Sequence, residues 1–313
     1  MSAVTEVRPS PIAGTWYEGQ ADRLARAVDG YIGAAKLPEL PGQVIAVIAP
    51  HAGHRYSGPV AGYAFAAVRG SSPSVVAVLS PMHNLYAYPF ITSAHAAYGT
   101  PLGNIQVNRE LVDDLDGRLK KRLGFGLTPV VNDPEHSLEI ELPFLQRAVK
   151  STFTLLPVML RQQSRESARQ MGEALAETLA GQNFLLVAST DLSHFHNQAA
   201  ANALDTAMLA QVAAFSPEGV FEMEETGKGE ACGLGALAAV LWAAKALGAD
   251  TVKVLKHATS GDVTGDFQRV VGYGAAVVLK GKSKKAGNAR PLLCLFNFSL
   301  LSYFSLLPLQ HPE

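Results

Sequence analysis

Short apolar runs alternate with amphipathic stretches along most of the chain. Residues 44–49 are apolar at every position and end at Pro50, and residues 74–80 and 184–189 form similar runs. Short, β-branched runs of this kind are typical of strands that are buried on both faces of a sheet. Intervening stretches such as 164–179 have the period of an amphipathic helix. The pattern predicts a three-layer αβα fold with a mainly parallel central sheet.

The remaining elements follow from the same reasoning. Further strands are expected at residues 91–98, 153–159, 251–257 and 270–279, and helices at 21–35, 59–68, 108–121, 202–215, 216–221 and 235–247. Pro157 would place its strand at an edge of the sheet, because proline cannot donate to the ladder. Asp133 followed by Pro134 predicts a helix start, which would put His136 and Glu139 on one helical face.

Polar side chains follow three of the predicted strands directly. His51 follows the first strand, His83 follows the second, and Asp191 and His194 follow the third. The carboxyl ends of parallel strands meet at one edge of a sheet, which is where ligands bind in open α/β sheets. We therefore expect these four side chains to share a site. His54 is expected to be a loop residue that points to solvent.

A thiol can join this group. Cys232 lies in the glycine-rich stretch 227–235, where the backbone can approach other groups closely. Imidazole and thiolate are ligands for zinc, iron and copper, and three protein ligands with an open position are typical of a catalytic metal site. Asp191 could orient an imidazole, and His194 could serve as an acid or base. His136 and Glu139 could lie on a solvated face of their predicted helix, or they could contact the metal ligands from outside. Both alternatives remain open.

Composition restricts the partners. The formal net charge of the 313-residue chain is −1, so no basic field indicates nucleic acid. Two cysteines are too few for a disulfide framework and indicate a reducing, cytoplasmic location. The first residues lack the basic and apolar regions of a secretory signal.

The end of the chain differs from the rest. Residues 1–281 read as a single α/β domain, whereas 282–313 are first basic and then apolar. The apolar part is interrupted by Asn297, serines and prolines, so we expect a poorly ordered extension rather than a membrane anchor.

Several short motifs together resemble the Memo family, which is also called AmmeMemoRadiSam system protein B. In the family's order they are VRPSPIAGTWYEG, APHAGHRYSG, SPMHN, TPLG, DPEHSLEIELPFLQ, STDLSHF, ACGLG, SGD and VGYGA, and they span about residues 7–280. Each motif is short, but the set is specific. The resemblance implies a fold similar to that of class III extradiol dioxygenases, in which two histidines and a carboxylate hold a non-haem iron.

The resemblance also implies a ligand set. His51 and His83 match the two imidazole ligands, and Cys232 matches the thiolate that replaces the carboxylate in Memo proteins. Asp191 and His194 match the neighbouring pair, with His194 at the place of an acid/base histidine. Tyr56, His136 and Glu139 fall in matching motifs and would lie around the ligands. Fe(II) is the expected metal, with copper or zinc as alternatives.

The resemblance bears on partners too. Bacterial members resemble components of a system with a radical-SAM protein and a second small protein, and animal members are linked to signalling through phosphotyrosine peptides. This chain has Ser80-Pro81-Met82-His83 where many members have Gly-Pro-Ser/Asn-His. The softer thiolate argues against catechol cleavage by analogy.

Three functions remain open at this point. The first is a metal-dependent redox enzyme with an unknown substrate, in which His194 transfers protons. The second is a binding or scaffold protein whose cleft takes a peptide or a small anion without turnover. The third is a hydrolase, either with zinc or with Ser193, His194 and Asp191, although no G-x-S-x-G elbow is present.

Overall fold

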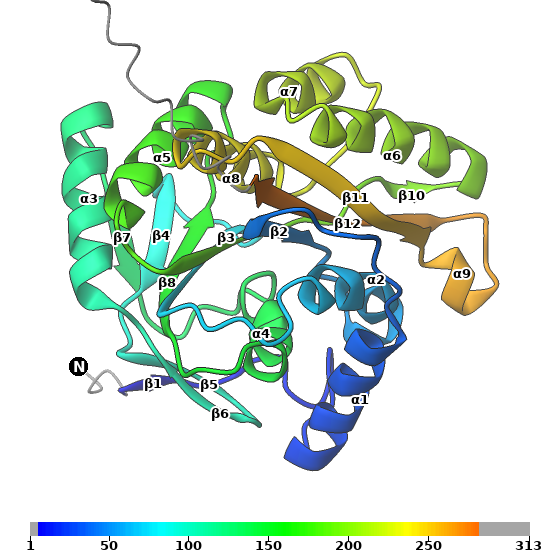
Figure 1. Ribbon diagram of the computed structural model, residues 1–313, viewed down its shortest axis with the longest axis horizontal. Helices are drawn as coiled ribbons and strands as arrows, with labels where there is room; N and C mark the ends of the chain where they lie inside the picture. Colours follow the sequence, from blue (N-terminus) through cyan, green and yellow to red (C-terminus); the bar gives the residue numbers. More distant parts are fainter. Residues whose placement is uncertain (1–5, 282–313) are drawn as a thin grey trace, which may run out of the picture. The chain divides into compact units, whose positions relative to one another are not determined.

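The computed structural model describes residues 6–281, which form a mixed α/β fold around one large sheet (Figure 1). The expectation for residues 282–313 lies outside this range. The sheet has nine strands in the order β10-β12-β2-β9-β3-β8-β4-β7, with β11 paired to β12. These strands are β2 (Gln43–Ala49), β3 (Val75–Pro81), β4 (Phe90–Ser93), β7 (Leu127–Val130), β8 (Thr154–Leu160), β9 (Phe184–Ser189), β10 (His194–His196), β11 (Thr251–Thr259) and β12 (Val270–Lys280).

The four central strands, β2, β9, β3 and β8, are parallel to one another. Their register places Ala46, Leu186, Ala77 and Leu156 in one row across the sheet, all without solvent exposure. Alternation of small and large side chains along such a row lets the covering helices approach closely. Outside this centre the sheet is mixed, because β12 runs antiparallel to β2 and β4 runs antiparallel to β8. The expected parallel pairing is therefore confirmed for the centre and for the outer pair β4 and β7, whereas the rest of the sheet is antiparallel.

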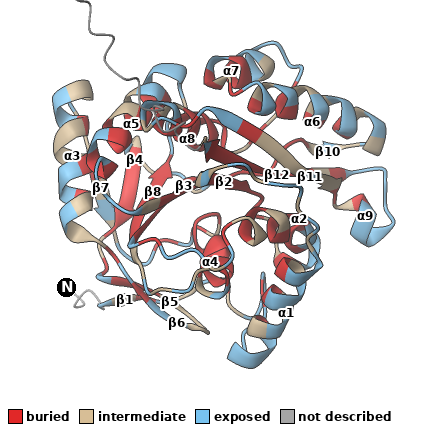
Figure 2. Ribbon diagram, in the orientation of Figure 1, coloured by how far each residue is buried: buried red, intermediate tan, exposed pale blue. Residues whose placement is uncertain are grey.

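Helices cover both faces of the sheet (Figure 1). Helix α8 (Leu234–Ala246) packs on β3 and β9 and carries α5 (Arg165–Leu179) on its outer side. Helix α2 (His54–Ala66) packs on β2 and β12 from the other face, with α1 (Ala21–Ala34) outside it. The central strands are buried and the outer helices are exposed along their outward sides, as Figure 2 shows. The layered architecture follows the alternation of apolar runs and amphipathic stretches.

Shorter elements complete the fold. A second sheet contains β1 (Val7–Arg8), β5 (Ala97–Thr100) and β6 (Gly103–Gln106). The other helices are α3 (Arg109–Leu123), the 3₁₀ helix η1 (Glu139–Glu141), α4 (Leu142–Ala148), α6 (Gln198–Ala213), α7 (Pro217–Glu225) and α9 (Gly261–Thr264). Among residues 6–281, no helix combines the length and the apolar character that a membrane span requires.

Two strand predictions were wrong in detail. The stretch 91–98 is divided between β4 and β5, which belong to different sheets. Strand β8 is interior although it contains Pro157. The proline is tolerated because β4 pairs only with Met159 and Leu160, so no antiparallel partner needs an N–H group from Pro157.

Two helix starts also differ from the prediction. Helix α2 begins at His54 and continues through Pro59, so His54 is a buried helical residue rather than a loop residue. No helix begins at Asp133, because both oxygens of its carboxylate bind the guanidinium of Arg8. His136 consequently lies in a loop, and η1 starts three residues later.

We expect Gly172→Ala to destabilise the fold by about 1–3 kcal/mol, because an added methyl group would overpack the contact between α5 and α8. A Cβ atom at Gly172 would lie 2.6 Å from the carbonyl oxygen of Ala239. Gly117 in α3 is the matched control, since a Cβ atom there meets nothing within 4 Å. Urea unfolding should show Gly117→Ala to be neutral or stabilising by up to about 1 kcal/mol. Equal effects of the two substitutions would contradict the packing argument.

Candidate metal centre

Three adjacent parallel strands end at one edge of the sheet and deliver the expected side chains there. His51 follows β2, His83 follows β3, and Asp191 follows β9, which lies between the other two strands. His51 and Asp191 are buried, and His83 is more exposed. The prediction that these strand ends share an edge is confirmed.

Three imidazoles gather at this edge. One ring nitrogen from each of His51, His83 and His136 lies within 4.8 Å of the other two. The ring of His51 meets His83 and His136 nearly edge-on, with centroid distances of 5.3 and 5.5 Å. The rings of His83 and His136 are stacked at 4.8 Å. Such a group could hold one metal ion.

Each of these imidazoles has an oxygen partner near its Nδ1 atom. Nδ1 of His83 lies 2.9 Å from Oε1 of Glu135, and Nδ1 of His136 lies 3.2 Å from the same oxygen. Nδ1 of His51 lies 2.9 Å from Oγ of Ser189. Partners at Nδ1 leave Nε2 as the ligating atom, which is the usual arrangement around a metal-bound histidine. The donor set therefore fits a transition-metal ion.

Glu135 connects two of the three histidines. Its Oε1 also accepts hydrogen bonds from the backbone amides of His136 and Ser137, each at 3.0 Å, and its Oε2 accepts from the amide of His83 at 2.6 Å. Burial alone would raise the pKa of Glu135, but the hydrogen bond and charge of His83 and the amide of Ser137 hold that pKa well below its usual range. An ionised carboxylate thus orients both rings.

Burial keeps two of the imidazoles, those of His51 and His136, neutral at neutral pH. Burial lowers the pKa of His51 well below its ordinary value, and positive charge on His136 or His83 would lower it further. Burial also lowers the pKa of His136 to about 4, although Glu135 opposes the shift. Metal ligation requires an unprotonated nitrogen, so these shifts favour binding.

Cys232 lies beside this group. Its Sγ atom is 3.1 Å from Nε2 of His51. The loop before α8 is held against the end of β9, where a Cβ atom on Gly233 would come within 2.4 Å of the Ser189 carbonyl oxygen. Burial raises the pKa of the Cys232 thiol, and Asp191 adds to this shift. The group of three imidazoles contains His136, whereas Cys232 was expected as the third ligand, and that expectation stays a prediction.

Asp191 and His194 take different roles from those expected of a hydrolase. Oδ1 of Asp191 accepts hydrogen bonds from the backbone amides of His51 (2.7 Å) and Ala52 (3.3 Å), so it orients the chain rather than a ring. Burial raises its pKa to about 7. Nδ1 of His194 donates to the carbonyl of Leu192 at 2.8 Å. Oγ of Ser193 is buried without a hydrogen-bond partner, so these residues form no Ser-His-Asp triad.

Two other predicted residues lie away from the three imidazoles. The carboxylate of Glu139 accepts hydrogen bonds from Arg8, Ser10 and Tyr17. It therefore binds the N-terminal segment and does not contact the three histidines. Tyr56 is 38% exposed and lines a neighbouring cavity. His54 donates through Nε2 to the carbonyl of Ile140 at 3.0 Å, and burial lowers its pKa to about 4.

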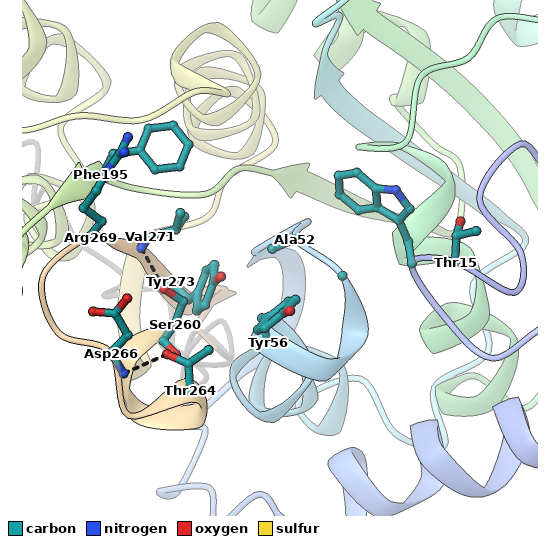
Figure 3. Close-up of a pocket in the computed structure, with 12 residues that line it drawn as sticks. Thr15, Ala52, Tyr56, Phe195, Ser260, Thr264, Asp266, Arg269, Val271 and Tyr273 are labelled. Atoms are coloured by element: carbon teal, nitrogen blue, oxygen red, sulfur yellow. Dashed lines mark hydrogen bonds between the residues drawn. The ribbon is translucent and has the colours of Figure 1, made fainter.

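A cavity of about 550 Å³ (Figure 3) has Trp16 in its wall, and the ring centres of Trp16 and His136 are 4.1 Å apart. Its wall includes neighbours of His51 and His194 in the chain. Phe195 adopts a left-handed backbone conformation with φ of 63°, and its side chain is 62% exposed. The guanidinium carbon of Arg269 lies 5.3 Å from the centre of the Phe195 ring, as Figure 3 shows. The lining residues are Thr15, Trp16, Ala52, Gly53, Tyr56, Phe195, Ser260, Thr264, Asp266, Arg269, Val271 and Tyr273.

The sequence reasoning missed several residues of this centre. Glu135 could have been found from its position next to His136, and Ser189 from its place at the end of an apolar run. Glu141, Phe195 and Arg269 carry no local signal, since only the folded chain brings them near the site. Their contribution depends on contacts between distant segments.

Comparisons with known proteins find relatives over most of the chain. A family model described as "Memo: Memo-like protein" matches residues 8–277. The chain belongs to the Memo family. A MEMO1 family protein of Nitrosopumilus maritimus is 33% identical over 273 residues, covering 86% of this chain and 98% of the relative. Similar proteins occur in Methanopyrus kandleri (33% identical; 88% and 99% covered) and Methanosarcina mazei (31%; 87% and 99%).

The Memo family match includes every residue of the centre described above, from His51 to Cys232. The resemblance suggested by the short motifs is therefore confirmed at the level of the family.

We expect Glu135→Gln to lower the affinity for Co(II) by 10- to 100-fold, a range typical of lost contacts behind metal ligands. Every hydrogen-bond partner of the Glu135 carboxylate is a donor, so either orientation of a glutamine would set its NH₂ group against a donor. Competition with a chromophoric chelator measures the affinity. Glu166→Gln, at an exposed carboxylate on α5, is the control and should leave the affinity unchanged. Wild-type affinity in the Glu135 variant would show that this carboxylate does not organise the centre.

Proposed function

We propose that this Memo-family chain binds one transition-metal ion through Nε2 of His51, His83 and His136 and supports redox chemistry on a small substrate. The observation that carries the proposal is the shared geometry of the three rings. Each has Nδ1 next to an oxygen, and one nitrogen of each ring lies within 4.8 Å of a nitrogen of the other two. A fold like that of class III extradiol dioxygenases is part of this proposal.

The donor types favour iron or copper, with zinc as an alternative, because imidazole suits all three metals. The thiol of Cys232 next to His51 adds a soft donor that favours iron or copper. When bound, such an ion would supply electron transfer and polarise an oxygen atom of the substrate.

The chain's own residues would provide the proton transfer. Nδ1 of His194 is used as a donor to Leu192, which leaves the unprotonated Nε2 as an acceptor. Burial lowers the pKa of His194, so the ring is neutral and able to take a proton. The cavity walls of Tyr56, Phe195 and Tyr273 would hold an apolar part of the substrate away from water.

A second candidate is a protein that binds a small anion or a peptide in the same cavity without turnover. Arg269 favours it, because its guanidinium has no salt bridge or hydrogen bond to any residue in the range 6–281 and lies against the ring of Phe195. An unpaired cation at the rim of an apolar cavity would attract a negatively charged group. A radical-SAM protein and a second small protein are the proposed macromolecular partners in either case.

Metal analysis after anaerobic purification tests the first function. Wild-type protein should carry close to one equivalent of metal, and His83→Ala and His136→Ala should lose most of it because each variant lacks one of three ligands. Cys232→Ala should retain the metal, because the three imidazoles hold it without the thiol.

His257→Ala is the control, because His257 binds Asp205 and takes no part in the centre. Full metal content in His136→Ala, together with loss in Cys232→Ala, would replace His136 by Cys232 in the ligand set. Equally low metal in wild type and all variants would refute a metal-dependent function.

For the second candidate, we expect Arg269→Gln to weaken binding of inorganic phosphate about fivefold, the effect of one exposed ion pair. Quenching of the fluorescence of Trp16, which lines the cavity, gives the affinity. Arg26→Gln, at an exposed arginine on α1, should bind phosphate like the wild type. Equal affinities in both variants would exclude Arg269 as the anion-binding group.

A further inference from the structure

A second buried carboxylic group lies behind the metal centre, on the far side of His51. Glu141 is at the end of η1, and its side chain is buried. Its Oε1 lies 2.8 Å from Oγ of Ser189, whereas its Oε2 is buried without a hydrogen-bond partner. In the range 6–281, Glu141 has no salt bridge. The metal-binding proposal above assigns no role to this group.

The hydroxyl group of Ser189 has three neighbours and only one hydrogen atom. Its Oγ lies 2.6 Å from the carbonyl oxygen of Ser137, 2.8 Å from Glu141 and 2.9 Å from Nδ1 of His51. A hydroxyl donates one hydrogen bond and accepts two. A carbonyl oxygen can only accept, so the hydrogen of Ser189 belongs on the short contact to Ser137.

Both remaining neighbours must then donate to Ser189. His51 donates through Nδ1–H, and Glu141 donates through Oε1–H, which requires Glu141 to be a neutral acid. In the opposite assignment, an ionised Glu141 would accept from Ser189. The oxygens of Ser189 and Ser137 would then face each other at 2.6 Å without a hydrogen atom, and Oε2 would be a buried, unpaired charge.

We propose that Glu141 is a positioning residue that, as a neutral carboxylic acid, donates to Ser189 and so fixes the hydroxyl that holds His51 with its Nε2 free for a metal ion. This inference rests on the proposed function of the histidine group. The same assignment leaves Nε2 of His51 without a hydrogen atom. The thiol of Cys232, 3.1 Å away, is then the donor to that nitrogen in the metal-free protein.

An ionised carboxylate usually supports a metal-bound histidine, whereas the assignment above makes Glu141 a neutral acid. Substitutions can distinguish these two forms. Glutamine can donate to Ser189 through its amide, so Glu141→Gln replaces a neutral donor but cannot replace a proton acceptor. Methionine is similar in length and cannot donate, which makes Glu141→Met the matched disruptive variant. Ser189→Ala removes the hydroxyl itself.

Infrared spectroscopy of the metal-free protein gives the first test. Wild-type protein should show the carbonyl band of a buried, protonated carboxylic acid near neutral pH, and Glu141→Gln should lose the part of it that belongs to Glu141, whereas any contribution from Asp191 should remain. ¹⁵N NMR of histidine-labelled protein should place the hydrogen of His51 on Nδ1 in wild type and in Glu141→Gln. In Ser189→Ala, His51 should shift toward the other tautomer. Absence of a band that depends on Glu141 would overturn the proposal.

Co(II) affinity gives the second test. Glu141→Gln should bind within about threefold of wild type, whereas Ser189→Ala should bind 10- to 100-fold more weakly and Glu141→Met should fall between them. Equal losses in Glu141→Gln and Glu141→Met would mean that an ionised carboxylate is needed, which also overturns the proposal. If no variant and no wild-type protein bound Co(II), the metal function would fail, while the infrared and tautomer results would still decide the role of Glu141.

Discussion

One buried, ionised carboxylate, Glu135, connects two of the three histidines that could hold a metal ion. Glu135 is almost without solvent exposure, yet it keeps its charge because every group that contacts it is a donor from His83, His136 or Ser137. A buried charge is tolerated only when such partners replace its water. The same contacts bring a loop histidine next to a histidine at the end of a strand. Ser137 adds a second link from the same loop to β3, because its Oγ donates to the carbonyl of Pro81 at 2.8 Å.

Arg8 extends this constraint to the N-terminal segment. Its guanidinium binds the carboxylate of Asp133 and also donates to the backbone carbonyl of Glu135 at 2.8 Å. A further bond joins it to Glu139, and the ring of Tyr98 lies 4.9 Å from its guanidinium carbon. Removing one partner of a buried ion pair costs about 3–5 kcal/mol. Two contacts therefore fix the loop that carries His136. Arg8 binds Asp133 and the backbone of Glu135, and His83 binds the Glu135 carboxylate.

The parts of this structure that the sequence revealed are those set by local pattern. Apolar runs predicted β2, β3 and β9. The parallel arrangement expected of such strands was enough to predict that His51, His83 and Asp191 lie at one edge of the sheet. The placement of His136 could not be read in this way. Asp133 and Pro134 form a good helix start in isolation, but the bond to Arg8, 125 residues away, outweighs the capping preference.

The same limit applies to burial. His54 follows a glycine and precedes an arginine, which suggested a loop, although Phe144 and Tyr17 cover its ring in the folded chain. Cys232 was correctly placed beside His51, because a glycine-rich segment permits close approach. The distance from its thiol to His83 and His136 depends on how closely the loop before α8 packs against the sheet edge. The spacing of residues in the sequence does not predict that distance.

Strain at Phe195 points to the side of the centre where a ligand would enter. A left-handed conformation costs an aromatic residue on the order of 1–3 kcal/mol, and such strain persists where the surrounding structure enforces it. Here His194 and His196, on either side, are both held by Glu230. Phe195 is thereby turned outward into the cavity wall beside Arg269. Strand β10 holds His194, the proton acceptor that we propose, and also places Phe195 in the cavity wall, so both groups come from three consecutive residues.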